Sequence, residues 1–192
     1  MASGGMFILS HREFSLRPVQ ATRTHDLVHR IPGLTMVFFY GKSCEHCDVL
    51  KPIFMSLQGR VPGVHFAMAN VSADDMQLQK MSEASITPIR YVPFLAVYVN
   101  GTFYMEYRGP KTAESIARAV VEISAKLESG KDFVTGRVCQ APSGQPGYCA
   151  EGGDENDVCY FSFDEAYNGK PVSNENKGSF VTFEEAYGGA RI

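Results

Sequence analysis

Two cysteines separated by two residues, Cys44 and Cys47, are the residues of this chain best suited to covalent chemistry. They follow the apolar run Leu34–Tyr40 and precede a stretch, Asp48–Leu57, whose apolar residues recur at helical spacing. A strand that leads through C-x-x-C into a helix is typical of a redox dithiol. The first sulfur then lies at the helix N-terminus, where unpaired N–H groups and the helix dipole favour the thiolate that attacks disulfides.

Two other functions for this cysteine pair have to be weighed, a zinc site and an inert structural pair. A structural zinc ion needs a second pair of Cys or His ligands at close spacing. The remaining cysteines, Cys139, Cys149 and Cys159, are far along the chain and ten residues apart, and there is no second C-x-x-C. The spacing therefore favours the redox dithiol, and we expect neither a metal nor a cofactor.

Composition excludes several classes of partner. The chain has 192 residues, 44% of them hydrophobic, which suits one domain with an appendage. A net charge of −3 provides no basic field for nucleic acid. No apolar run approaches the ~20 residues of a membrane span, and the first residues lack the basic head and long apolar stretch of a secretory signal. We therefore expect a cytoplasmic protein.

The last quarter of the chain differs in charge from the rest. Residues 139–192 contain nine acidic and three basic side chains, whereas the preceding part has a small excess of basic ones. This shift, with the Pro/Gly/Ser-rich residues 141–147, predicts a boundary near residue 135. We expect a domain over residues 1–135 that folds without an acidic tail over residues 136–192. Cys139 and Cys149 flank the Pro/Gly cluster at a spacing that suits a disulfide, but a reducing compartment argues against one.

Periodicity and turn signals predict an α/β fold with a central mixed sheet flanked by helices. Asn100-Gly101 is a strong hairpin signal. Strands are expected at Phe7–Ser10, Leu34–Tyr40, Val64–Val71, Phe94–Val99 and Thr102–Tyr107, and helices at Arg23–Arg30, Asp48–Leu57, Asp74–Ala84 and a closing segment that carries the stripe Ile116, Ala119, Val120, Ile123 and Leu127.

This order of elements resembles the thioredoxin superfamily over about residues 5–130. The resemblance is carried by the apolar strand before the dithiol, Pro52 inside the following helix, Val92-Pro93 at the head of a strand, Asn100-Gly101 in the hairpin and Gly109 before the last helix. It implies a thioredoxin fold and thiol–disulfide exchange on protein substrates. It also implies a cis peptide bond before Pro93, with the Val92 backbone left to pair with an extended substrate.

The resemblance implies a role for each residue of the site. Cys44 would be the exposed attacking thiol and Cys47 the resolving one. His46 resembles the histidine of the C-x-H-C motifs in disulfide isomerases and bacterial periplasmic oxidases, where it stabilises the thiolate and makes the pair more oxidising. Glu45 opposes this effect by adding negative charge. Val92, Glu45 and Tyr40, which stands where relatives often carry Trp, are expected to contact the substrate.

Two positions depart from the family pattern. Phe38 occupies the position of the buried carboxylate that accepts a proton from the resolving cysteine, and Ser43 replaces the usual Trp before the first cysteine. Without the carboxylate, deprotonation of Cys47 should be slow. Phe38 and the long C-terminal tail favour an alternative function, a thioredoxin-fold structural or scaffolding protein that is anchored in a larger assembly through this tail. A thioredoxin-like virion protein of a large DNA virus would be one example.

The acidic tail contains a repeated aromatic–acidic element. The segment 161–169 recurs as 181–189, each copy with an acid three residues after Ser or Thr and a Gly stop. We expect a docking peptide that is used twice for avidity on a protein partner, with Phe163, Tyr167, Phe183 and Tyr187 as the contact residues. The other possibility is that both copies pack against their own domain.

Overall fold

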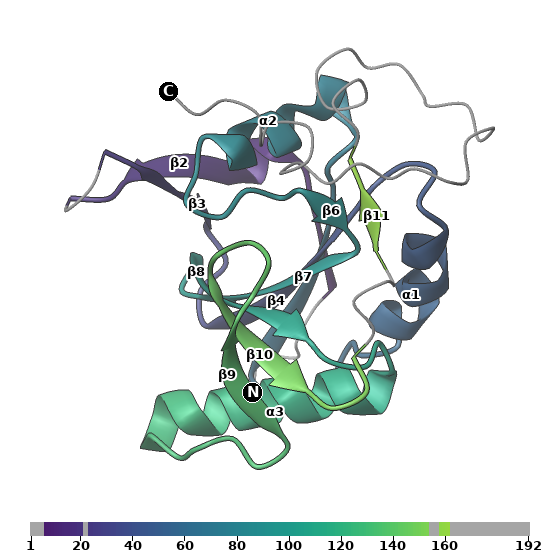
Figure 1. Ribbon diagram of the computed structural model, residues 1–192, viewed down its shortest axis with the longest axis vertical. Coiled ribbons are helices and arrows are strands. Elements are labelled where there is room, and N and C mark those ends of the chain that lie inside the picture. Colours follow the sequence, from purple (N-terminus) through teal and green to yellow (C-terminus); the bar gives the residue numbers. More distant parts are fainter. Residues whose placement is uncertain (1–5, 21–22, 154–157, 162–192) are drawn as a thin grey trace, which may run out of the picture.

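The computed structural model describes residues 6–20, 23–153 and 158–161 (Figure 1). The strands are β1 (Met6–Leu9), β2 (Phe14–Pro18), β3 (His25–His29), β4 (Leu34–Tyr40), β5 (Val64–Asn70), β6 (Tyr91–Val92), β7 (Phe94–Val99), β8 (Thr102–Arg108), β9 (Gly136–Gln140), β10 (Pro146–Ala150) and β11 (Cys159–Tyr160). The helices are α1 (Glu45–Met55), α2 (Gln77–Glu83) and α3 (Ala113–Ser129), with 3₁₀ turns at His11–Glu13 and Asp74–Met76.

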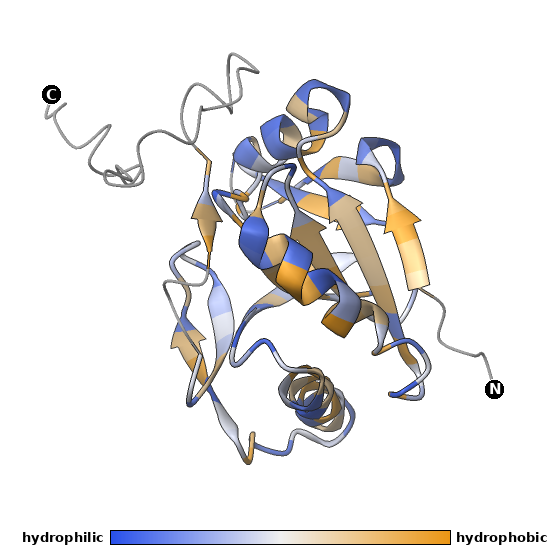
Figure 2. Ribbon diagram, turned by 90° about the vertical axis from the view of Figure 1, so that its right-hand side faces the viewer, coloured by the Kyte–Doolittle hydropathy of each residue, from blue (hydrophilic) through white to orange (hydrophobic). Residues whose placement is uncertain are grey.

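A mixed sheet in the order β1-β5-β4-β7-β8-β10-β9 forms the centre of the molecule. Strand β4 is parallel to β5 and antiparallel to β7, and every residue from Leu34 to Phe39 is buried. A continuous apolar run is what a strand covered on both faces requires. Figure 2 shows these central strands as predominantly apolar, whereas the helices carry hydrophilic and hydrophobic residues in alternation. The expected central mixed sheet is therefore present.

Adjacent phenylalanines of β4 mark the two faces of the sheet. The ring of Phe38 lies 5.3 Å from that of Phe54 in α1, and Phe39 lies 5.7 Å from Phe14 in β2. Successive side chains of a strand point to opposite faces. Helix α1 therefore covers one face, and the β2–β3 hairpin covers the other.

The segment expected to form a helix at Arg23–Arg30 is instead strand β3, so that prediction is wrong. Strand β3 pairs antiparallel with β2, with Leu27 opposite Leu16 and His29 opposite Phe14. Leu27 and His29 are buried, while the residues between and before them are partly exposed. This period of two fits a half-buried strand, and β2 supplies the partner that the sequence did not reveal.

The sheet also continues past residue 135, where the sequence predicts a domain boundary. Strand β10 pairs parallel with β8 and antiparallel with β9, and the Pro/Gly/Ser-rich residues form the turn between β9 and β10. Tyr148 of β10 is buried, stacks on Tyr107 of β8 and donates its hydroxyl to Glu122 of α3. Residues 136–150 thus belong to the same folded unit as the sheet, and the expected boundary falls inside it.

Strands β6 and β11 form a separate two-stranded ribbon beside the main sheet. They pair antiparallel, with Cys159 opposite Val92 and Tyr160 opposite Tyr91. Figure 1 shows β11 running between β6 and α1. Residues that lie 67 positions apart in the sequence thereby meet at the end of the molecule where α1 begins. Within the described part of the chain, no helix is long and apolar enough to cross a membrane.

Candidate redox site

The two cysteines of the C-x-x-C lie at the start of α1 and are joined by a disulfide, with their Cα atoms 5.2 Å apart. Cys44 is the N-cap residue of the helix, and its sulfur accepts the backbone N–H of Cys47 at 3.2 Å. A sulfur in this position meets N–H groups that have no partner inside the helix. The same groups would stabilise a thiolate on Cys44 after reduction.

The peptide bond between Val92 and Pro93 is cis, as expected from the resemblance. The Cys44 sulfur lies 3.7 Å from the carbonyl oxygen of Val92. Pro93 has no backbone N–H, so the peptide group between Val92 and Pro93 offers the Cys44 sulfur a carbonyl and no donor. Cys44, Cys47, Val92 and Pro93 are therefore brought together from segments almost fifty residues apart.

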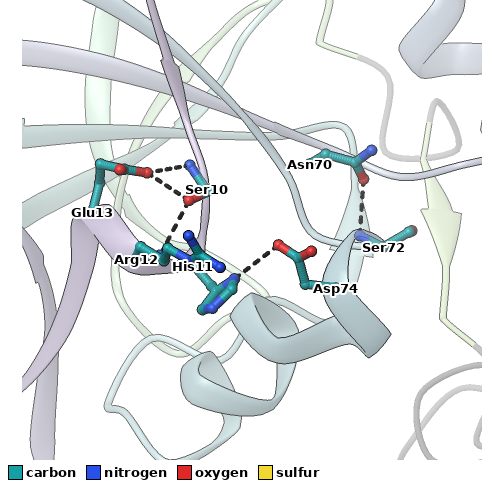
Figure 3. A network of polar contacts seen from close by, with 7 residues as sticks. All are labelled: Ser10, His11, Arg12, Glu13, Asn70, Ser72 and Asp74. Carbon is teal, nitrogen blue, oxygen red and sulfur yellow. Dashed lines mark hydrogen bonds and ion pairs between the residues drawn. The ribbon is translucent and has the colours of Figure 1, made fainter.

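Polar contacts at the carboxyl end of β5 hold the loop that leads to Cys44. The backbone N–H of Lys42 donates to the Ser72 hydroxyl at 3.0 Å, and the Ser72 N–H donates to the Asn70 side chain at 2.9 Å. Figure 3 shows the Asn70–Ser72 contact beside His11, whose Nδ1 lies 2.9 Å from Asp74. The first two contacts join the cysteine loop to the end of β5, and the third joins the segment after β5 to the 3₁₀ turn His11–Glu13.

Both sulfur-bearing side chains are inaccessible in this state. Cys44 and Cys47 are each 2% exposed, although their neighbours Lys42, Ser43 and Glu45 are exposed. The expectation of an exposed Cys44 is therefore wrong for this oxidised form. Strand β11 lies beside Val92, the residue whose carbonyl contacts Cys44.

The other residues expected in the site lie close to it along the chain. Glu45 and His46 occupy the first turn of α1, the former exposed and the latter half-buried. Tyr40 is half-buried at the end of β4, with the Lys51 ammonium 4.8 Å from the centre of its ring. The four tail residues expected to bind a partner, Phe163, Tyr167, Phe183 and Tyr187, lie outside the described residues.

Phe38 is fully buried against α1, so the position of the expected proton acceptor is apolar. The sequence did not single out Glu106, which is also buried but on the opposite face of the sheet. Its carboxylate accepts hydrogen bonds from the Tyr91 hydroxyl and, at 2.8 Å, from the Ser143 hydroxyl. Burial raises the pKa of Glu106 above its usual range. The one signal in the sequence is a lone acid inside an otherwise uncharged strand segment, Thr102–Tyr107.

Glu106 supports the proline side of the site through Tyr91. That tyrosine is buried directly before Val92-Pro93, and burial beside the Glu106 carboxylate raises its pKa. A pocket of about 210 Å³ borders this cluster and is lined among others by Tyr91, Pro93, Glu106 and Arg108. The carboxylate therefore positions β6 and does not reach the cysteines.

The sequence also gave no indication that residues 159–161 would join the site. The N–H of Phe161 donates to the carbonyl of Arg90 at 3.2 Å, which extends the pairing of β11 with β6. A Cβ placed on Gly41 would lie 3.5 Å from the Phe161 ring and 3.2 Å from a methyl of Val92. Phe161 therefore packs on the loop that leads to Cys44. Only the tertiary pairing reveals this, because a two-residue strand has no periodicity to detect.

The sequence is similar to those of two proteins from invertebrate iridescent viruses. The chain is 34% identical over 139 residues to Uncharacterized protein 196R of Invertebrate iridescent virus 6, covering 72% of this chain and 77% of the relative. It is 30% identical over 167 residues to Uncharacterized protein 020R of Invertebrate iridescent virus 3, covering 86% of this chain and 98% of the relative.

Cellular proteins are similar over shorter parts of their length. Protein disulfide-isomerase like 2-2 of Arabidopsis thaliana is 30% identical over 104 residues, covering 54% of this chain and 22% of that protein. Human ERp44 in its zinc-bound form superposes with a TM-score of 0.40 at 23% identity, over 47% of this chain and 26% of that chain. The family model for thioredoxin matches residues 17–122, more than half of the sequence. This chain belongs to the thioredoxin family.

Proposed function

We propose that the protein is a thiol–disulfide oxidoreductase that acts on protein substrates through Cys44 and Cys47. One observation carries the proposal: the Cys44 sulfur lies at the N-terminus of α1 and next to the carbonyl that precedes cis-Pro93. The helix end favours the thiolate. The Val92 backbone, which pairs with β11 in this structure, can pair instead with an extended polypeptide once β11 is displaced.

The chemistry is a pair of exchange steps. The Cys44 thiolate attacks one sulfur of a substrate disulfide, a mixed disulfide forms, and the other substrate sulfur leaves as a thiolate that takes up a proton. Cys47, after losing its proton, then attacks the Cys44 sulfur. The Cys44–Cys47 disulfide forms and the second substrate thiol is released, so the substrate gains the two electrons that the dithiol loses.

The residues around the dithiol modify these steps. The imidazole of His46 favours the thiolate of Cys44 and so the reduced form of the pair, while the carboxylate of Glu45 opposes it. Tyr40 and the Val92 backbone contact the substrate. Because Phe38 provides no proton acceptor beside α1, release of the mixed disulfide by Cys47 is the slow step and accelerates with pH.

Turnover of a protein disulfide tests the proposal. The reduced full-length protein is expected to reduce the interchain disulfides of insulin in the presence of dithiothreitol, faster than dithiothreitol alone. Cys44→Ser should abolish this acceleration, whereas the double change Cys139→Ser and Cys149→Ser should preserve it. A protein whose rate equals that of Cys44→Ser would not be an oxidoreductase of this kind.

The second candidate function is structural, with the fold serving in a larger assembly. It is supported by the burial of Cys44, the apolar residue at Phe38 and the similarity to proteins of two invertebrate iridescent viruses. In that case the protein would be located in a virion, otherwise in the cytoplasm. The double variant Phe163→Ala and Phe183→Ala would then lose partner binding while its dithiol chemistry stays unchanged.

A further inference from the structure

The strand β11 is placed where an extended polypeptide substrate of the proposed function would bind. It pairs antiparallel with β6, the two residues that precede cis-Pro93. The pairing is extended by the hydrogen bond from the Phe161 N–H to the Arg90 carbonyl. The Val92 edge, which the proposed function assigns to substrate, is therefore occupied by the protein's own chain.

The register of this pairing places Cys159 directly opposite Val92. Residues directly opposite each other in an antiparallel pair carry their side chains on the same side of the ribbon, with Cβ atoms roughly 5 Å apart. The Cys44 sulfur lies 3.7 Å from the carbonyl of the same Val92. Val92 thus has one cysteine sulfur against its backbone and a second cysteine as its cross-strand neighbour.

The packing of Phe161 indicates which side of the ribbon Cys159 faces. Residues 159 and 161 share a face because a strand alternates with a period of two. The Phe161 ring and the Val92 side chain both pack against Gly41, three residues before Cys44. Cys159, half-buried between them in register, therefore faces the cysteine loop, while Tyr160 faces the other way and packs its ring edge against Tyr91.

We propose that Cys159 is a third redox cysteine, an internal substrate that exchanges with the Cys44–Cys47 disulfide. The inference rests on the proposed function, because it needs a reactive Cys44. The structure has a second disulfide, Cys139–Cys149, with Cα atoms 6.0 Å apart, so the expectation that a reducing compartment argues against it is wrong. Cys159 belongs to neither disulfide. Its thiolate attacks the Cys44 sulfur, the Cys44–Cys159 bond forms, and Cys47 leaves as a thiolate that takes up the proton Cys159 has lost. The step is an isomerisation, so it needs no external oxidant.

The exchange gives β11 a second role in the reaction. While Cys44 is bonded to Cys159, external substrates are excluded from the Val92 edge and Cys47 is held as a thiol. Return of Cys47 to Cys44 restores the state observed here. A protein substrate must displace β11 before it reaches Cys44, which is consistent with the burial of both sulfurs.

The test uses the full-length Cys47→Ser variant, reduced and then exposed to about 1 mM oxidised glutathione, followed by acid quench, alkylation and peptide mapping. Glutathione first forms a mixed disulfide with Cys44, and Cys159 then displaces it. Because Cys159 is held one strand away, its effective concentration exceeds the millimolar level of a flexible linker. We expect the Cys44–Cys159 peptide to exceed the Cys44–glutathione adduct by about tenfold or more.

Two matched variants in the Cys47→Ser background show whether the placement of β11 is the cause. Phe161→Ala, which removes the ring that packs on the cysteine loop, should lower that ratio several-fold. Val134→Ala changes a remote exposed side chain and should leave it unchanged. Equal ratios in all three proteins would refute the claim that the packing of Phe161 on the cysteine loop places Cys159 for the exchange.

The outcomes separate this inference from the proposed function. A Cys44–glutathione adduct without any Cys44–Cys159 peptide would refute the role of Cys159 while Cys44 remains a reactive thiol. An unmodified Cys44 would refute both. To exclude an effect of the serine, Cys47→Ala should give the same product as Cys47→Ser.

Discussion

At the scale of single residues, the site consists of one sulfur with two sets of neighbours. The Cys44 sulfur is surrounded by the first turn of α1 on one side and by the Val92 carbonyl on the other. The helix end favours the thiolate. The Val92 backbone pairs with β11 here, and in the proposed function it pairs with a substrate. In the proposed function, His46 and Glu45, both in the first turn, adjust how strongly the reduced form is favoured.

Replacement of His46 by proline tests this adjustment. Proline is tolerated in the first turn of a helix, and the change removes an imidazole that favours the Cys44 thiolate. We expect the dithiol to become more reducing by tens of millivolts, where about 30 mV corresponds to ~1.4 kcal/mol. Equilibration with glutathione measures the shift. Glu45→Gln is the matched change and should shift the potential in the opposite direction, so equal potentials in all three proteins would contradict these roles.

His29 provides a prediction about pH that is independent of the dithiol. It is buried between Phe14 and Tyr98, and burial lowers its pKa to about 4. The unfolded chain, with a histidine pKa near 6.5, binds more protons between these values, so acidification favours unfolding. Between pH 7 and 4 the wild type should lose on the order of 2 kcal/mol of unfolding free energy more than His29→Phe. Urea unfolding across this range measures the difference, and parallel curves would refute the assignment.

At the scale of elements, the segment that precedes Pro93 depends on a buried carboxylate that joins two strands and a turn. Glu106 of β8 accepts from Tyr91 in β6 and from Ser143 in the β9–β10 turn. The hydroxyls would lose their partner in Glu106→Ala, which also leaves a cavity, so we expect a loss of about 2–4 kcal/mol of unfolding free energy. Glu106→Gln keeps an acceptor and should cost less than half as much.

Urea unfolding distinguishes these two changes. Glu114→Ala, in the exposed first turn of α3, serves as the control and should stay within about 0.5 kcal/mol of the wild type. Glu106→Ala should also weaken insulin reduction, because it loosens the strand that precedes Pro93. If Glu106→Ala and Glu106→Gln were equally stable, the carboxylate would have no positioning role.

The elements also show what the sequence could and could not predict. The dithiol and the central strand β4 were predictable because each has a local signature, C-x-x-C and a continuous apolar run. The cis proline followed only from the resemblance to the thioredoxin superfamily. Strand β3 and the site residues Cys159 and Phe161 were not predictable. The sequence pattern of a segment as short as His25–His29 is compatible with either a helix or a strand. Only the pairing with β2 shows that it is a strand. Glu106 was missed because burial of a lone acid depends on donors far away in the sequence.

At the scale of the whole molecule, the folded unit ends well beyond the change in charge near residue 135. Strands β9 and β10 bury Tyr148 and satisfy Glu106, and β11 covers the site. A chain cut after residue 135 should therefore be less stable by about 3 kcal/mol or more, or fail to fold. A chain cut after residue 161 keeps these contacts and should melt at a higher temperature than the shorter chain. Thermal unfolding of both fragments decides this, and equal melting temperatures would contradict the extended domain.

The central claim, that Cys44 and Cys47 form an exchanging dithiol, is tested most directly by the reduction potential of the pair. The full-length protein is equilibrated with glutathione buffers, quenched with acid, alkylated and mapped, so that the Cys44–Cys47 disulfide is counted separately from every other. We expect reversible exchange with a potential above about −270 mV, the value of thioredoxin, because His46 favours the reduced form. A pair that does not exchange, or whose potential lies below about −300 mV as in structural disulfides, would contradict the account.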